Sequence, residues 1–197
     1  EPELHKALSA HGVATALNAL SKWPDIPVCA TAASALAERL SDDPDLREAL
    51  DASNLPQVLN ALSKWPNVPA GGEVVDALAK RLVDEPELRN ALDPLGVPNA
   101  LNALSKWPNV PVCSAAVDAL AARLANEPGL RKDLCPQGVG NALNALSKWP
   151  DSQVCAAAAS ALAERLTNDA GLRQAFDPIN VTQALNALSK WTGTPAC

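Results

Sequence analysis

The residues best suited to binding chemistry are lysines that recur at one position of a repeating sequence. A Lys side chain carries a compact positive charge and three N–H donors, which can bind phosphate or carboxylate groups. The ladder consists of Lys22, Lys64, Lys106, Lys148 and Lys190. One interpretation is a site for an anionic ligand or nucleic acid. The other is that each lysine complements the dipole at a helix end and binds nothing.

Residues that could act in catalysis or hold a metal do not form a pattern. The sequence has no Gly-x-Ser-x-Gly motif, no phosphate-binding glycine loop and no paired Cys and His. Its histidines, His5 and His11, lack a cysteine or an acidic cluster at metal-ligand spacing. We therefore expect no enzymatic activity, no metal and no cofactor.

Four of the five cysteines share one repeat position, which argues against disulfides. They are Cys29, Cys113, Cys155 and Cys197. Equivalent residues of stacked units lie about 10 Å apart, beyond the ~7 Å between Cα atoms that a disulfide allows. We expect small, buried thiols in a reducing compartment, whereas Cys135 stands at another position and should be exposed.

These side chains are positioned by a repeat that runs through the whole chain. The heptapeptide Leu-Asn-Ala-Leu-Ser-Lys-Trp occurs five times in the 197 residues, and its tryptophans stand at 23, 65, 107, 149 and 191. A constant period of this size, 42 residues, indicates a solenoid. The units are 1–42, 43–84, 85–126, 127–168 and a partial 169–197. We expect 1–197 to be a single repeat domain and a segment of a longer array.

Each unit predicts three helices. A short helix follows an Asp or Asn cap, a medium helix ends at Lys-Trp, and a long helix follows, such as residues 28–40. The tryptophans continue the apolar face of the medium helix, so we expect them to pack between units. Gly or Asn stands near the start of each medium helix, which predicts a positive φ there. We expect the arginines of the long and short helices to pair with aspartates such as Asp51 and Asp93.

The repeat resembles known families at two levels. The residues Gly96-Val97-Pro98-Asn99-Ala100-Leu101, with Leu104, Ser105, Asn109 and Ala119-Leu120, resemble an armadillo repeat, and HEAT repeats are close relatives. This resemblance implies an all-α, right-handed α-solenoid with three helices per unit. The tetrapeptide Ser-Lys-Trp-Pro at 21–24, 63–66, 105–108 and 147–150 is similar to SKWP-repeat type III secretion effectors of plant-pathogenic bacteria. That resemblance implies secretion into a host cell, to its cytoplasm or nucleus, and a host protein as partner.

A candidate partner-binding surface comes from the armadillo resemblance, in which the third, long helix lines the concave face. Positions aligned on that face differ between units and are mostly acidic. They are Ser34, Glu38, Glu73, Asp76, Lys80, Asp118, Ser160 and Glu164. They predict a groove for a basic segment of a host protein, and the alternative is a solvated face without a ligand. The Trp and Asn side chains that hold extended peptides in the best-known armadillo proteins do not stand here, so import-receptor activity is not expected.

Composition narrows the remaining function classes. A net charge of −6 argues against nucleic acid as a general partner. No apolar stretch approaches the ~18 residues of a membrane helix. We expect a monomeric, non-enzymatic binding scaffold, and a purely structural spacer is the remaining alternative.

Overall fold

The computed structural model describes residues 7–191, and these residues form helices joined by short turns, with no strand among them. The medium helices are α1 (Ala10–Leu20), α4 (Asn54–Leu62), α7 (Gly96–Leu104), α10 (Pro136–Leu146) and α13 (Pro178–Leu188). The long helices are α2 (Pro27–Asp42), α5 (Pro69–Asp84), α8 (Pro111–Asn126) and α11 (Gln153–Asn168). The short helices are α3 (Pro44–Glu48), α6 (Pro86–Asn90), α9 (Pro128–Asp133) and α12 (Ala170–Gln174). The expected three-helix unit is therefore present.

The turn before each medium helix is closed by a side chain that caps the helix. The Asp93 carboxylate accepts a hydrogen bond from the Gly96 backbone N–H at 2.6 Å, and Asp177 accepts one from Asn180 at 2.7 Å. These bonds satisfy amides that the first helical turn leaves without a partner. The aspartates expected to pair with arginines thus serve as helix caps.

The prediction of positive φ near the start of the medium helices is wrong, because no residue of the described chain has one. Close packing between units explains the small residue instead. A Cβ added to Gly96 would lie 3.4 Å from the Pro56 side chain of the preceding unit and 3.2 Å from Asp93 Oδ1. A Cβ at Gly138 would lie 3.3 Å from Pro98, the equivalent proline. These glycines allow α4, α7 and α10 to approach closely.

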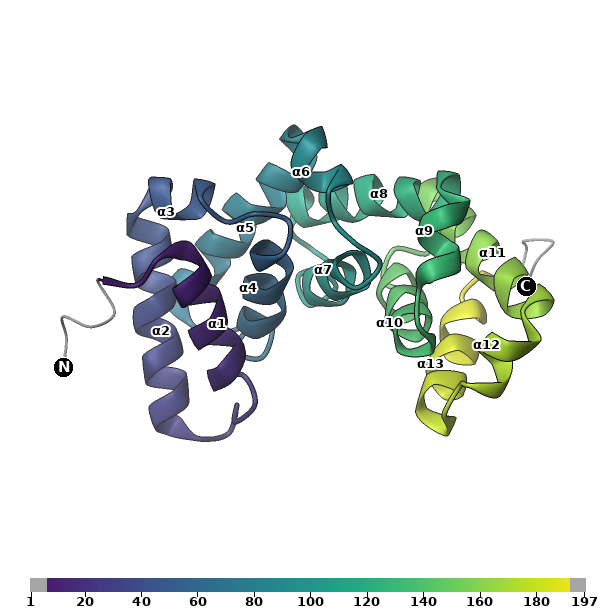
Figure 1. The fold of residues 1–197 in the computed structure, drawn as a ribbon, viewed down its shortest axis with the longest axis horizontal. Coiled ribbons are helices and arrows are strands. Elements are labelled where there is room, and N and C mark those ends of the chain that lie inside the picture. The colour runs from purple at the N-terminus through teal and green to yellow at the C-terminus, as the bar shows by residue number, and fades with distance from the viewer. Residues whose placement is uncertain (1–6, 192–197) are drawn as a thin grey trace.

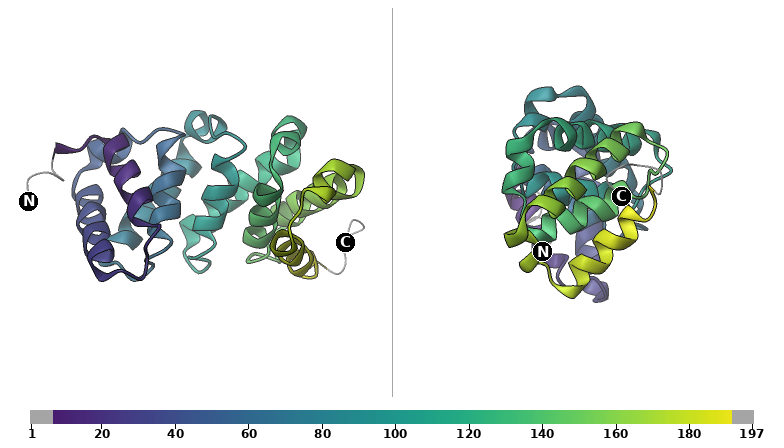
Figure 2. Two further views of the ribbon diagram at one scale, coloured as in Figure 1. Left: turned by 60° about the horizontal axis from the view of Figure 1, so that its bottom comes forward. Right: turned by 90° about the vertical axis from the view of Figure 1, so that its right-hand side faces the viewer.

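Equivalent helices of successive units pack side by side in two rows. The medium helices contact each other in the order α1, α4, α7, α10 and α13, and the long helices do so in the order α2, α5, α8 and α11 (Figures 1 and 2). Figure 2, left, brings the underside of Figure 1 forward and shows the medium helices in front. Each unit thus packs on the next, and the same side chain returns at regular intervals along each row.

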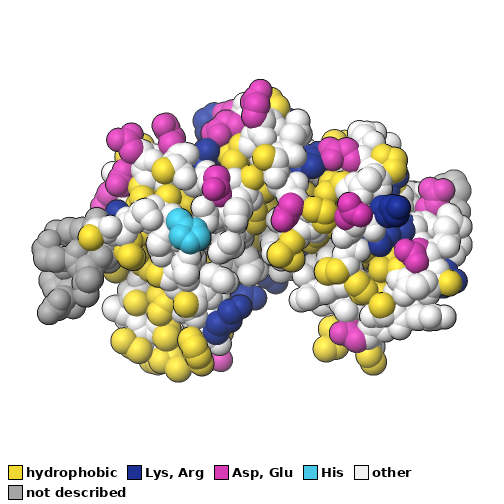
Figure 3. Space-filling model, in the orientation of Figure 1, with side chains coloured by type: hydrophobic (Ala, Val, Ile, Leu, Met, Phe, Trp, Pro, Cys, Tyr) yellow, Lys and Arg dark blue, Asp and Glu magenta, His cyan; other side chains and the backbone are white. Residues whose placement is uncertain are grey.

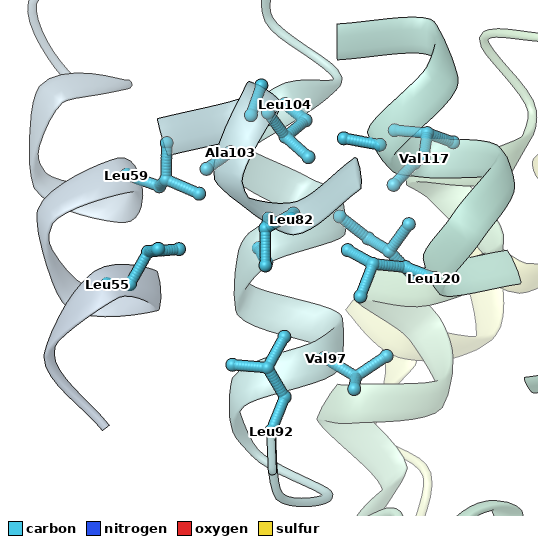
Figure 4. Packing of buried hydrophobic residues seen from close by; sticks show 14 of the residues in the cluster. Leu55, Leu59, Leu82, Leu92, Val97, Ala103, Leu104, Val117 and Leu120 are labelled. Carbon is cyan, nitrogen blue, oxygen red and sulfur yellow. The ribbon is translucent and has the colours of Figure 1, made fainter. Parts of the chain in front are cut away.

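The apolar core lies between the two rows and continues from unit to unit. Figure 4 shows this packing around α4, α5, α7 and α8. The labelled residues, none more than 2% exposed, are Leu55, Leu59, Leu82, Leu92, Val97, Ala103, Leu104, Val117 and Leu120. Complete burial of a leucine contributes about 1.5–3 kcal/mol, so this shared core is the main source of stability.

The prediction that the tryptophans pack between units is confirmed for three of the five, whereas Trp107 is half-buried. Trp65, Trp149 and Trp191 are buried, and Trp65 Nε1 donates to the Pro24 carbonyl of the preceding unit at 3.0 Å. Trp191 Nε1 donates to the equivalent Pro150 carbonyl at 3.2 Å. Trp23 stands in the first unit and is 56% exposed. The role of the buried tryptophans is therefore inter-unit packing.

Long-helix arginines hold the long helix to the short helix of the same unit, through backbone carbonyls and not through the expected aspartates. Arg123 Nη1 donates to Arg89 O at 2.6 Å and to Leu92 O at 3.0 Å, where α6 ends. Its other nitrogens bind the Glu127 carboxylate at 2.8 and 2.9 Å. Arg81 and Arg165 bind equivalent carbonyls. The positive charge of each arginine also lies beside the last carbonyls of a short helix, where the helix dipole is negative.

Candidate functional site

The eight predicted partner-binding residues lie on the long helices. Ser34 and Glu38 are on α2, Asp118 is on α8, and Ser160 and Glu164 are on α11. The α5 helix carries the other three, which are Glu73, Asp76 and Lys80. Glu38, Glu73, Asp76, Lys80 and Glu164 are exposed, whereas the serines and Asp118 are half-buried. The row of long helices brings this set onto successive units, and we call it the acidic face.

Two acids of the acidic face hold neighbouring long helices together. Ser41 Oγ on α2 donates to Glu73 Oε2 on α5 at 2.7 Å. Ser152 Oγ, which caps α11, donates to Asp118 Oδ1 on α8 at 2.6 Å. Glu73 and Asp118 therefore have a structural role that the sequence did not reveal, because their serine partners lie 32 and 34 residues away in the chain.

Three acids of the face have no ion pair within the described residues. They are Glu38, Asp76 and Glu164, and all three are exposed. The one base in the set, Lys80, forms an ion pair with Asp84 at 2.5 Å, and this hydrogen bond raises the pKa of Lys80. Its charge is thus largely offset by a residue of its own helix, so the face keeps its negative potential.

The repeat-position cysteines are unsuited to reactive chemistry. Cys113 and Cys155 are fully buried free thiols, and burial raises the pKa of Cys113 to about 11 and that of Cys155 to about 12. Since the thiolate is the nucleophile and the metal ligand, both side chains are inert near neutral pH. Cys29 is half-buried, Cys135 is exposed as predicted, and Cys197 and His5 lie outside the described residues.

The lysine ladder occupies a different surface, at the C-terminal ends of the medium helices. All five lysines are exposed, and none forms an ion pair in the part of the chain that the structure describes. In Figure 3 the lower outline of the molecule is hollowed, and Lys and Arg side chains border this hollow beneath α4 and α7. The hollow seen in this view is on the side of the medium helices, so the expected concave face of long helices is not confirmed.

The sequence places Asn18 and its equivalents one helical turn before the ladder lysines, but the reasoning missed a further row of amide side chains one turn earlier on the medium helices. Gln57, Asn99, Asn141 and Gln183 stand seven residues before the lysines of their units. Asn60, Asn102, Asn144 and Asn186 stand four residues before them. The signal was present in the sequence as a helical spacing of polar residues, and it becomes informative once the medium helices are seen to lie in a row.

The cavities and clusters of the described chain offer no catalytic constellation. A cavity of about 350 Å³ among α11, α12 and α13 is lined mainly by apolar residues such as Phe176 and Leu185, with Arg173 as its charged group. No group of His, Cys, Asp and Glu within residues 7–191 could hold a metal ion. Among these residues, no helix has the length and apolar character to cross a membrane.

Comparisons with models of known families, with curated proteins and with solved structures found no match to this chain.

Proposed function

We propose that this chain is a non-enzymatic scaffold that binds a basic segment of a partner protein along its acidic face. The proposed architecture is a right-handed α-solenoid of armadillo or HEAT type, supported by the two rows of equivalent helices and by side-chain hydrogen bonds between successive units. The resemblance to SKWP-repeat effectors supports a host protein as partner and delivery into the host cytoplasm or nucleus. The proposed scaffold is monomeric.

The observation that carries this proposal is the unbalanced charge of the acidic face. Glu38, Asp76 and Glu164 are exposed and form no ion pair within the described residues, and the one lysine of the face, Lys80, lies between Asp76 and Asp84 on its own helix. The Glu38 carboxylate accepts one hydrogen bond from Ser34 Oγ at 3.2 Å and keeps its charge. Exposed ion pairs contribute up to about 1 kcal/mol each. Three new pairs at about 0.5 kcal/mol each would strengthen binding by about tenfold. Such a surface selects a partner by sign of charge and by the spacing of its basic residues.

The test compares two variants that lose the same charge. The first carries Glu38→Gln, Asp76→Asn and Glu164→Gln, and it spares Glu73 and Asp118, which hold units together. The second, a matched control, carries Asp42→Asn, Glu48→Gln and Glu87→Gln, which are exposed and have no ion pair in the described chain.

The readout is fluorescence anisotropy of a labelled Lys/Arg-rich peptide at physiological salt. We expect the first variant to bind about tenfold more weakly than the wild type, and the control to lose much less. Circular dichroism confirms that both variants are folded. Equal losses in the two variants would assign binding to net charge alone and reject the acidic face. No binding by the wild type would favour the structural spacer.

A further inference from the structure

The medium helices form a second polar surface, separate from the acidic face. In each unit, three side chains at positions i, i+3 and i+7 lie on one side of the medium helix. The first residue is Thr15, Gln57, Asn99, Asn141 or Gln183. The second is Asn18, Asn60, Asn102, Asn144 or Asn186. The third is the ladder lysine, and we call the whole set the amide–lysine face.

This face points away from the core and carries no acidic side chain. On α4, Leu55, Leu59 and Leu62 are fully buried between the rows, whereas Lys64 is exposed and Asn60 is half-buried. On α7 and α10 the equivalent apolar residues are likewise buried, and the equivalent lysines are exposed. The face therefore presents amides and positive charge to solvent at every unit.

Most amide groups of the amide–lysine face form no hydrogen bond within the described residues. Among the amide side chains of the face, Gln57 alone makes a hydrogen bond within the described residues, from Nε2 to Ser53 O at 3.1 Å. Gln183 Oε1 is buried and has no hydrogen-bond partner there. Gln183, Asn144 and Asn186 line a cavity of about 440 Å³ between α10 and α13. An amide both donates and accepts, so it can pair with the N–H and the C=O of a polypeptide backbone.

The spacing of the face selects the conformation of the partner. Packed helices lie about 8–10 Å apart, so equivalent side chains recur at about that distance along the row. A polyproline II chain rises about 3.1 Å per residue with three residues per turn, so every third side chain returns at about 9.3 Å. In a β-strand the side chains on one face recur every ~6.6 Å, so they would not match the spacing of the lysines along the row. Polyproline II also leaves its backbone N–H and C=O groups free.

We propose that the amide–lysine face binds an acidic protein segment in the polyproline II conformation, with an Asp or Glu at every third residue. Each carboxylate meets the lysine of one unit, and the amides of that unit contact the backbone between carboxylates. Five lysines define four intervals, which corresponds to a segment of about 13 residues. The unpaired lysines provide charge, and the amides provide recognition of the extended backbone.

The experiment uses the full chain and fluorescein-labelled probes of equal charge. The first probe is a 13-residue peptide, (Glu-Pro-Pro)4-Glu, and the second has the same composition with its glutamates adjacent. The third is a six-nucleotide oligo-dT, whose five phosphodiesters carry the same charge as the five glutamates of each C-terminally amidated peptide. Anisotropy titrations are repeated at several salt concentrations. We expect the first peptide to bind at least fivefold more tightly than the second peptide and than the oligonucleotide. Equal affinity for both peptides, or tighter binding of oligo-dT, would overturn the proposal.

Matched variants test which face is responsible. Lys64→Gln with Lys106→Gln should weaken binding of the first peptide by about tenfold, whereas Lys132→Gln with Arg173→Gln removes the same charge from exposed residues outside both faces and should weaken it by less than threefold. Equal losses in the two double variants would overturn the proposal.

The amides and the acidic face receive separate tests. Asn102→Ala with Asn144→Ala should reduce the preference for the first peptide while leaving the salt dependence of binding unchanged, and an unchanged preference would contradict the role of the amides. The acidic-face triple variant should bind this peptide at least as well as the wild type, so failure of one proposal is distinguishable from failure of the other.

Discussion

The sharpest test of how a unit is held together is to replace Arg123 with methionine. The Arg123 side chain is 9% exposed and binds two carbonyls at the end of the short helix of its own unit and both oxygens of Glu127. Methionine keeps the apolar stem of the side chain and removes the guanidinium. The Arg89 and Leu92 carbonyls at the end of α6 and the Glu127 carboxylate then lose their charged donor.

The magnitude follows from the kind of bond that is lost. Hydrogen bonds to a charged group contribute about 1.5–3 kcal/mol each, and a buried acceptor left without a partner costs about 1–3 kcal/mol. The ion pair between Arg123 and Glu127 is partly exposed, so it contributes less to the free energy of unfolding. The two carbonyl bonds therefore dominate, and we expect Arg123→Met to lower the free energy of unfolding by about 3–4 kcal/mol.

The assay is urea unfolding followed by circular dichroism and by tryptophan fluorescence. The control is Arg173→Met, because Arg173 is exposed and donates to Leu166 O and Thr167 O, so water can replace its bonds. We expect this control to lose about 1 kcal/mol or less. Losses that agree within experimental error would refute the argument that buried carbonyl bonds hold the long helix to the short helix within a unit.

Three further predictions concern stability and reactivity. A Cβ added to Gly72 in α5 would meet nothing within 4 Å, so Gly72→Ala should stabilise the protein by about 0.5–1 kcal/mol in thermal unfolding. The raised pKa values of Cys113 and Cys155 predict that iodoacetamide at pH 8 labels the exposed Cys135 first and leaves those two thiols unlabelled until the protein unfolds, as mass spectrometry will show. The hydrogen bond from its arginine partner lowers the pKa of Glu127, so the stabilisation is complete above about pH 4.5 and is lost as the pH falls through the folded-state value. A Glu127→Gln variant should therefore lose less stability than the wild type between pH 5 and pH 3 in urea titrations, and an identical pH profile would contradict this.

The sequence predicted the helices and their order because the chemical signals are local. Caps, prolines and apolar spacing act within a few residues, so the three helices of a unit can be located without knowing how they pack. The tryptophan prediction succeeded for Trp65, Trp149 and Trp191, because an apolar residue that continues a buried face is usually covered by the neighbouring unit, but Trp23 is exposed and Trp107 is half-buried. Trp65 and Trp191 both donate to a carbonyl of the preceding unit.

Predictions that depended on contacts between residues far apart in the sequence failed. The arginines were expected to meet aspartates, but they bind backbone carbonyls at a helix end, which the types of side chain do not indicate. Gly96 was explained by backbone conformation, whereas a Cβ there would lie 3.2 Å from Asp93 Oδ1 and 3.4 Å from the Pro56 side chain of the preceding unit. Asp118 was treated as a free acid, and its serine partner becomes apparent only when α8 and α11 are adjacent.

The tryptophan contacts also imply how the array would respond to tension. Trp65 Nε1 and Trp191 Nε1 bind proline carbonyls, but Trp149 Nε1 is buried with no hydrogen-bond partner in the described chain. A buried donor without a partner costs about 1–3 kcal/mol, so the joint between the third and fourth units is weaker by that amount. If the two ends are pulled apart, we expect α7 and α10 to separate before α8 and α11 do, because the hydrogen bond between Ser152 and Asp118 also holds the long helices together at this joint.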